Sequence, residues 1–125
     1  EGDPYYCFCH KTARLVAERL KLSEDKYILS FQSRFGSEEW LQPYIDEEIV
    51  RLAKKGVKNL HIISPGFSVD CLETLEEIKI QYDELFKENG GDNLSYIPCL
   101  NDHDDHIKLI DKLIKVNMSD WRNGK

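Results

Sequence analysis

Apolar residues recur along the chain at two different spacings, which predict alternating helices and strands. A helical period of apolar positions predicts helices over residues 6–22, 43–56, 70–91 and 102–116. Short apolar runs rich in strand-forming residues predict buried strands over residues 26–32, 57–64 and 94–98. The order α-β-α-β-α-β-α predicts an α/β fold of three layers, in which helices flank a short parallel sheet.

The same spacing assigns an inward face to the long helices. The expected buried positions are Leu15, Val16, Leu20 and Leu22 in the first helix, Leu72, Leu75, Ile78, Tyr82 and Leu85 in the third, and Ile107, Ile110, Leu113 and Ile114 in the last. Pro43 suits the first turn of the second helix and Gly56 its end, whereas Gly90 and Gly91 suit the end of the third. We expect one domain over residues 1–116 and a polar tail over residues 117–125.

Composition narrows the class of partner. Seventeen basic and 23 acidic residues give a net charge of −6, which argues against nucleic acid as the main partner. No apolar run reaches transmembrane length. The four cysteines, Cys7, Cys9, Cys71 and Cys99, are interpreted as reduced thiols of a cytoplasmic protein rather than as a disulfide framework. The opening EGDPYY lacks an initiating Met and indicates a piece of a longer protein.

Function is expected beyond the carboxyl ends of the strands, where open α/β sheets bind ligands. Polar segments occupy those positions at residues 33–40, 65–71 and 99–106. In the last segment, His103 and His106 stand among aspartates and would suit a transition metal, although the helix dipole also explains acids at a helix N-terminus.

A second group of metal-binding residue types lies near the N-terminus, at Cys7, Cys9 and His10. On the predicted helix, however, Cys7 and Cys9 point about 200° apart and cannot chelate one ion together. We therefore interpret them as structural.

The segment DCLETLEE carries the most informative acids. Asp70 as N-cap and Glu73 three residues later would form a capping box, in which Glu73 reaches back to the Asp70 amide. That reading does not explain Glu77 and Gln81, which follow Glu73 at intervals of four and share its helix face. Like charges at this spacing are unfavourable on a bare helix, so the row also fits a cleft lined by carboxylates, for metal or proton transfer.

Ordered motifs give the chain a specific resemblance. GDPY (Gly2 to Tyr5), FQSRFG (Phe31 to Gly36), the run Glu39 to Glu47, PGFSVDCLETLEEI (Pro65 to Ile78) and YIPCLND (Tyr96 to Asp102) together resemble the C-terminal half of bacterial-type ferrochelatases. The resemblance implies the insertion of Fe(II) into protoporphyrin IX, the terminal step of haem biosynthesis. It implies two Rossmann-like domains around a porphyrin cleft, of which this chain is the second. The family's catalytic His, in a Ser-Ala-His motif, would precede GDPY and lie outside this chain.

The resemblance also implies roles for individual residues. Glu73 matches the catalytic glutamate, and Glu73 with Glu77 would carry metal or protons. Substrate-binding roles are implied for Gln32, Ser33, Trp40, Phe67 and Asp70, and Arg34 is the candidate cation for the porphyrin propionates. Two positions depart from the family pattern: Cys71 stands where other members have His, and Gln81 where some have an acid.

The chemistry of metal insertion agrees with these assignments. A porphyrin needs aromatic walls, for which Phe35, Trp40 and Phe67 are candidates. Insertion releases two pyrrole protons, and a glutamate in an apolar cleft would have its pKa raised towards neutrality, which suits a base.

Several expectations concern cofactors, partners and alternatives. We expect Fe(II) as substrate, no permanently bound cofactor, and no iron–sulfur cluster because the tail lacks cysteine. The expected partners are a porphyrin, Fe(II) and the N-terminal domain of the same protein, and peripheral membrane association stays open. Alone, the chain should be inactive. The alternatives are a related cobalt or tetrapyrrole chelatase and a non-catalytic α/β ligand-binding domain.

Overall fold

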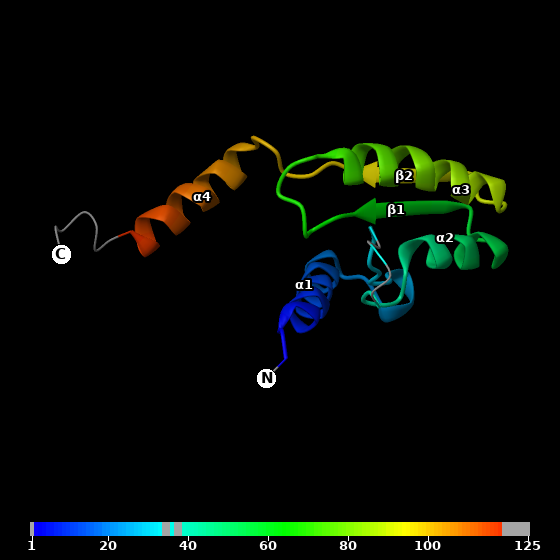
Figure 1. The fold of residues 1–125 in the computed structure, drawn as a ribbon, viewed down its shortest axis with the longest axis horizontal. Helices are drawn as coiled ribbons and strands as arrows, with labels where there is room; N and C mark the ends of the chain where they lie inside the picture. The colour runs from blue at the N-terminus through cyan, green and yellow to red at the C-terminus, as the bar shows by residue number, and fades with distance from the viewer. Residues whose placement is uncertain (1, 34–35, 37–38, 119–125) are drawn as a thin grey trace.

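The computed structural model describes residues 2–33, 36 and 39–118, and it confirms the α/β fold, with helices flanking a short parallel sheet (Figure 1). Strands β1 (Asn59–Ile63) and β2 (Asn93–Ile97) pair in parallel, with Leu60 opposite Leu94 and Ile62 opposite Tyr96. The crossover between them contains a helix, as a parallel connection requires.

Three of the four predicted helices are confirmed, with shifted ends. They are α1 (Tyr5–Leu20), α2 (Ile45–Lys54) and α4 (Asp104–Asn117), and a short 3₁₀ turn, η1 (Glu24–Lys26), follows α1. Gly56 follows the α2 C-cap at φ +88°, a left-handed conformation that favours glycine, so the predicted end of this helix is correct. The placement of Pro43 in the first turn is wrong, because α2 begins at Ile45 and the Pro43 carbonyl instead accepts a hydrogen bond from Phe31 N.

The predicted helix over residues 70–91 is two segments with different winding. Residues Glu73–Tyr82 form a π-helix, η2, and Asp83–Glu88 continue as the α-helix α3. A π-helix bonds residue i to i+5, so each turn holds more residues than the 3.6 of an α-helix. The predicted stop is correct, since the chain leaves α3 at Gly90 with φ +102°.

The predicted strand over residues 26–32 is wrong within the described chain. Only Phe31 makes a bridge, in which Phe31 N donates to Pro43 O at 2.9 Å and Ile45 N donates to Phe31 O at 3.0 Å. The apolar run in this segment has the residue types of a strand. A strand also needs a continuous backbone partner, and here the pairing ends at one residue.

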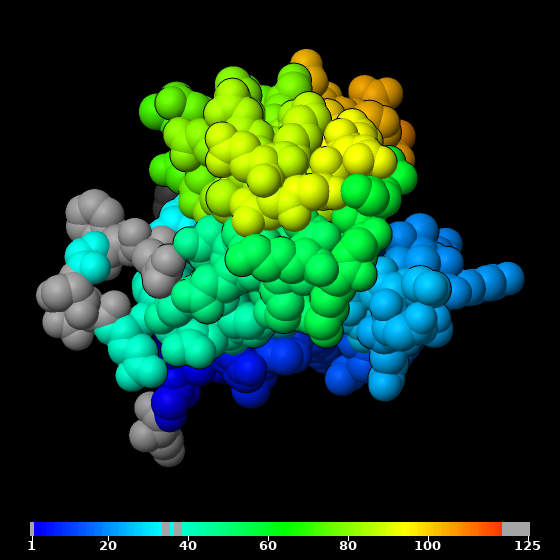
Figure 2. Space-filling view, turned by 90° about the vertical axis from the view of Figure 1, so that its right-hand side faces the viewer, coloured from blue at the N-terminus to red at the C-terminus, as the bar shows by residue number. Residues whose placement is uncertain are grey.

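The core lies between α2, α3 and one face of the sheet. Its buried members are Ile45, Ile49, Ala53, Phe86 and Leu94, with Leu60 and Ile62 packed against them. Ile45, Ile49 and Ala53 recur every four residues, which gives α2 one continuous apolar face. Figure 2 shows the resulting contact, with the yellow-green surface of α3 and β2 directly on the green surface of α2 and β1.

Several predicted inward faces are instead exposed. In α4 the four predicted core residues have exposed fractions of 40–53%, because this helix extends away from the sheet (Figure 1). In α1, Leu15 and Leu20 are exposed and Ala17 is the buried residue. In the third helical segment Leu72 and Leu75 are exposed, whereas Ile78 is fully buried. No helix among the described residues has the length and apolar character needed to cross a lipid bilayer.

The tight contact between Gly91 and Phe86 provides a test of the core. A Cβ atom at Gly91 would lie 2.3 Å from the Phe86 ring, which is fully buried and cannot turn aside. We expect Gly91→Ala to lower the free energy of unfolding by about 1–3 kcal/mol, the usual cost of overpacking. Urea denaturation of the chain measures this.

Gly66→Ala is the matched control, because a Cβ there would meet only the Tyr5 hydroxyl at an ordinary 3.8 Å. Equal stability of the two variants would contradict this account of the core.

Candidate active site

The carboxyl ends of the strands bring together segments from three parts of the chain. Gln32 Nε2 donates to the Glu73 carbonyl at 3.0 Å, which joins the segment after Phe31 to η2. Asn101 N donates to Ser68 O at 3.0 Å, which joins the loop after β2 to the loop after β1. The loops after β1 and β2, where function is expected, are thus in direct contact.

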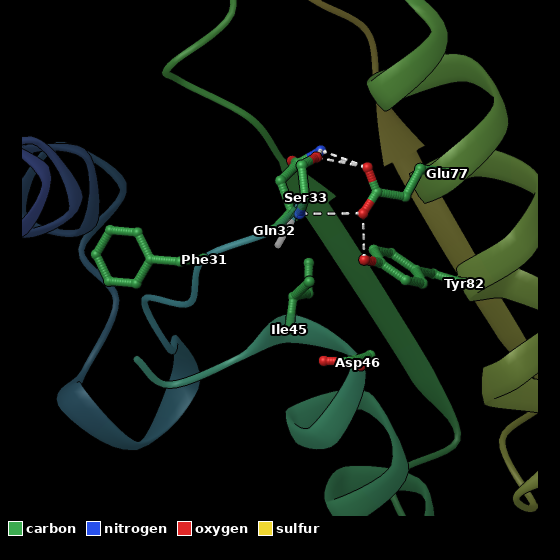
Figure 3. Close-up of a pocket in the computed structure, with 7 residues that line it drawn as sticks. All are labelled: Phe31, Gln32, Ser33, Ile45, Asp46, Glu77 and Tyr82. Carbon is green, nitrogen blue, oxygen red and sulfur yellow. Dashed lines mark hydrogen bonds between the residues drawn. The ribbon is translucent and has the colours of Figure 1, made fainter. Parts of the chain in front are cut away.

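Glu77 is surrounded by hydrogen-bond donors (Figure 3). Ser33 Oγ lies 2.6 Å from Oε2 and Ser33 N lies 3.2 Å from Oε1. Gln32 Nε2 donates to Oε2 at 3.3 Å, and Tyr82 OH donates to Oε1 at 2.5 Å. Several hydrogen bonds to both of its oxygens hold this carboxyl group in one orientation.

The π winding of η2 makes the contact between Tyr82 and Glu77 geometrically accessible. The two residues are five apart, a spacing that would place them on different faces of an α-helix. In a π-helix, residue i+5 follows i by little more than one turn. The sequence pattern missed this partner, since Tyr82 was assigned to the buried stripe.

A small cavity of about 210 Å³ adjoins Glu77. It is lined by Phe31, Gln32, Ser33, Ile45, Asp46, Glu77 and Tyr82 (Figure 3). Pockets for drug-sized ligands usually measure about 300–1,000 Å³, so this one suits an ion or a few waters and not a planar macrocycle.

Glu73 differs sharply from Glu77, although both belong to the same row. Its side chain is exposed, and the Cys71 thiol donates a hydrogen bond that lowers the pKa of Glu73 below its ordinary value. The expectation of a raised pKa is therefore wrong for this chain, because the apolar enclosure that would raise it is missing around Glu73. The carboxylate is ionised at neutral pH.

The capping box, the alternative explanation for Asp70 and Glu73, does not form. Asp70 N donates to Asn101 Oδ1 at 2.8 Å rather than to Glu73, and η2 has Leu72 at its N-cap with no side-chain bond. The Asp70 carboxylate accepts from Asn101 and Tyr96, and these bonds hold its pKa well below the ordinary range. Neither Asn101 nor Tyr96 stood out as a site residue in the sequence, although both lie in the motif YIPCLND.

The aromatic candidates lie at the edge of this site. Trp40 is 42% exposed, and its Nε1 donates to Gln32 O at 3.1 Å, so the ring is tied to the residue that contacts η2. Phe67 is half-buried in the loop after β1. Arg34 and Phe35 lie outside the described residues.

In the two other segments with metal-binding residue types, near Cys9 and near His103, the side chains form hydrogen bonds within the chain. Cys9 forms a hydrogen bond with Tyr5 on α1, and Cys7 is exposed. His103 is the N-cap of α4, where its Nδ1 accepts from Asp105 N, and His106 is buried with Nδ1 2.7 Å from Asn101 O. All four cysteines are free thiols.

Comparisons with known proteins agree on one family. A sequence model described as Ferrochelatase matches residues 1–118. The chain is 54% identical to the ferrochelatase of Rhizobium etli strain CFN 42 over 121 residues, which is 97% of this chain and 35% of that relative. It is 55% identical to the ferrochelatase of Marinobacter nauticus and 52% identical to that of Herminiimonas arsenicoxydans, each with 33% of the relative covered. The chain thus spans about a third of the length of the curated relatives it matches.

The contact between Cys71 and Glu73 generates a prediction about ionisation. Removal of the thiol in Cys71→Ala should raise the pKa of Glu73 towards its ordinary value, since the main cause of its depression is lost. A ¹³C NMR titration of the Glu73 carboxyl in the chain measures this shift. Cys71→Ser keeps a donor and should leave the pKa low, and an unchanged pKa in Cys71→Ala would count against the contact.

Proposed function

Since this chain belongs to the ferrochelatase family, we propose that, within a full-length protein, it forms one wall of an active site that inserts Fe(II) into protoporphyrin IX. The reaction would be the terminal step of haem biosynthesis. The observation that carries the proposal is an exposed, ionised Glu73 at the carboxyl edge of the sheet, four residues before a Glu77 that is held in place.

Glu73 suits the delivery of a divalent cation. An exposed carboxylate with a lowered pKa offers oxygen ligands at neutral pH without first losing a proton. Oxygen ligands hold Fe(II) less tightly than thiolates would, so the ion can pass on to pyrrole nitrogens. Once a flat apolar ring covers Glu73, desolvation would raise its pKa, which favours uptake of a pyrrole proton.

Glu77 would play a different part in the same row. Its oxygens accept from Ser33, Gln32 and Tyr82, so a cation would have to replace some of these donors. We propose that Glu77 holds metal transiently, and that Gln81, an amide, does not extend the row as a charged step.

The porphyrin would lie against the loops that carry Trp40 and Phe67. Trp40 is exposed and oriented by its bond to Gln32, which leaves an aromatic face available for stacking. Arg34 is proposed for the propionates from its place in the sequence, since guanidinium pairs well with carboxylate. We further propose a cytoplasmic protein that uses Fe(II) as substrate, without an iron–sulfur cluster.

The role of Glu73 is tested by a neutral isostere. In a full-length chelatase that contains this chain, Glu73→Gln should lower porphyrin metallation by on the order of a hundredfold or more, the usual contribution of a positioned base. The melting temperature should stay close to that of the wild type, because the side chain is exposed. The assay follows zinc or iron insertion into protoporphyrin by absorbance.

Glu76→Gln is the matched control, since Glu76 is also exposed on η2 but lies outside the row. Normal turnover in a folded Glu73→Gln variant would exclude the catalytic role.

A further prediction concerns the chain by itself. The purified 125-residue chain should not metallate porphyrin, because it spans about a third of its relatives and provides one wall of the proposed cleft. Its exposed apolar side chains on α1 and α4 should favour self-association. Absorbance spectra with porphyrin and zinc, together with light scattering, test both statements, and measurable insertion would contradict the first.

A further inference from the structure

We infer that Asp70 is a positioning residue rather than a substrate ligand: paired with Asn101, it fixes the start of η2 and thereby Glu73. This inference rests on the proposed function, because the importance of Glu73 comes from there. It reassigns a residue to which the family resemblance gives a substrate-binding role.

Asp70 and Asn101 form a reciprocal pair. Asp70 N donates to Asn101 Oδ1 at 2.8 Å, and Asn101 Nδ2 donates to Asp70 Oδ2 at 2.7 Å. The main chain and side chain of one residue thus meet both ends of a single amide. Such a pair closes when one of the two side chains is a carboxylate and the other an amide.

The remaining acceptor capacity of Asp70 is also in use. Its Oδ1 accepts from Tyr96 OH at 2.7 Å and from Cys99 N at 3.3 Å, and Thr74 Oγ1 lies 3.1 Å away. Burial raises the pKa of the Tyr96 hydroxyl, so that it stays a proton donor. With both oxygens engaged from within the chain, Asp70 would have to break these bonds to contact a substrate.

Asn101 is itself firmly held. Its backbone is left-handed, with φ +48°, a conformation that Asn and Asp tolerate better than most residues. Its N–H donates to Ser68 O at 3.0 Å, and its carbonyl lies 2.7 Å from Nδ1 of the buried His106. The pair therefore ties the beginning of η2 to the first turn of α4.

The pair acts on Glu73 through the residues on either side. Thr74 is fully buried, and its Oγ1 accepts from Cys71 N at 2.9 Å while it also contacts Asp70 Oδ1. Glu73 lies between Cys71 and Thr74, which these bonds hold in place. The Asp70–Asn101 pair therefore sets where the Glu73 carboxylate points. A displacement of about 1 Å at a reacting group can cost on the order of a hundredfold in rate.

The test compares variants that break the Asp70–Asn101 pair with a double variant that moves the carboxylate from position 70 to position 101. Asp70→Asn alone leaves two amides, whose NH₂ groups compete, and Asn101→Asp alone places two carboxylates against each other. The double variant Asp70→Asn/Asn101→Asp exchanges the two side chains, so an amide and a carboxylate again face each other. The exposed Asp102→Asn is the matched control, because it removes a carboxylate from the same loop.

We expect each single variant of a full-length chelatase that contains this chain to lose about 10- to 100-fold in kcat, with KM for porphyrin changed less than about threefold. The double variant should recover at least about tenfold of that loss, and Asp102→Asn should match the wild type. If Asp70 were a substrate ligand, KM would rise and the exchange would not restore activity. A rise in KM in the single variants, or a double variant that recovers no activity, overturns the inference.

A second readout needs no catalysis. The residue 70 amide is bonded to the side chain at 101, which competing amides or opposed carboxylates would displace in the single variants. In the 125-residue chain, hydrogen exchange at this amide should therefore quicken in the single variants and slow again in the double variant. Unchanged hydrogen exchange in Asp70→Asn and Asn101→Asp would refute the pair, even if the full-length protein did not metallate porphyrin.

If Asp70→Asn does not fold, Tyr96→Phe is the substitute, because it removes one donor to Asp70. A rise in KM without a fall in kcat in this variant would overturn the inference.

Discussion

The π winding of η2 is the constraint on which the site depends. Thr74 and Ile78 of η2, four residues apart, are both fully buried against the rest of the molecule. The π winding brings Tyr82 within 2.5 Å of Glu77, five positions away. An α-helix would turn the residue five positions away to another side. The local geometry of one segment therefore decides which side chains can act together.

The two glutamates of this segment have contrasting electrostatic surroundings. Glu77 accepts hydrogen bonds from Ser33, Gln32 and Tyr82, and those from Ser33 and Gln32 also hold the segment after Phe31 against η2. Glu73 is exposed and has a thiol neighbour, Cys71, as the main cause of its lowered pKa. One carboxylate of the row is therefore exposed, whereas the other is held by hydrogen bonds. The contrast arises from the different hydrogen-bond partners of the two carboxylates, and not from the spacing of the acids.

The apolar side chains on α1 and α4 are largely exposed to solvent. Leu15 and Leu20 on α1, and Ile107 and Leu113 on α4, are exposed although their spacing is that of core residues. Burial of such side chains is worth roughly 1.5–3 kcal/mol each, so long apolar stripes in water are unfavourable. The chain spans about a third of its curated relatives, and surfaces of this kind fit contact with more protein.

The amino-acid pattern alone determined the alternation of helices and strands from α2 to α4, the parallel pairing of β1 and β2, and the end of α2 at Gly56. These features follow from short-range periodicity and from glycine stereochemistry, which neighbours in sequence express directly. Motif resemblance singled out Glu73 and Glu77. Only the tertiary structure decided that Asp70 pairs with Asn101, that Tyr82 bonds Glu77, and that residues 26–32 form no strand beyond Phe31. The Asp70–Asn101 pair depends on hydrogen bonds between segments distant in sequence, and the Tyr82–Glu77 bond depends on a π winding that apolar spacing does not distinguish from an α-helix.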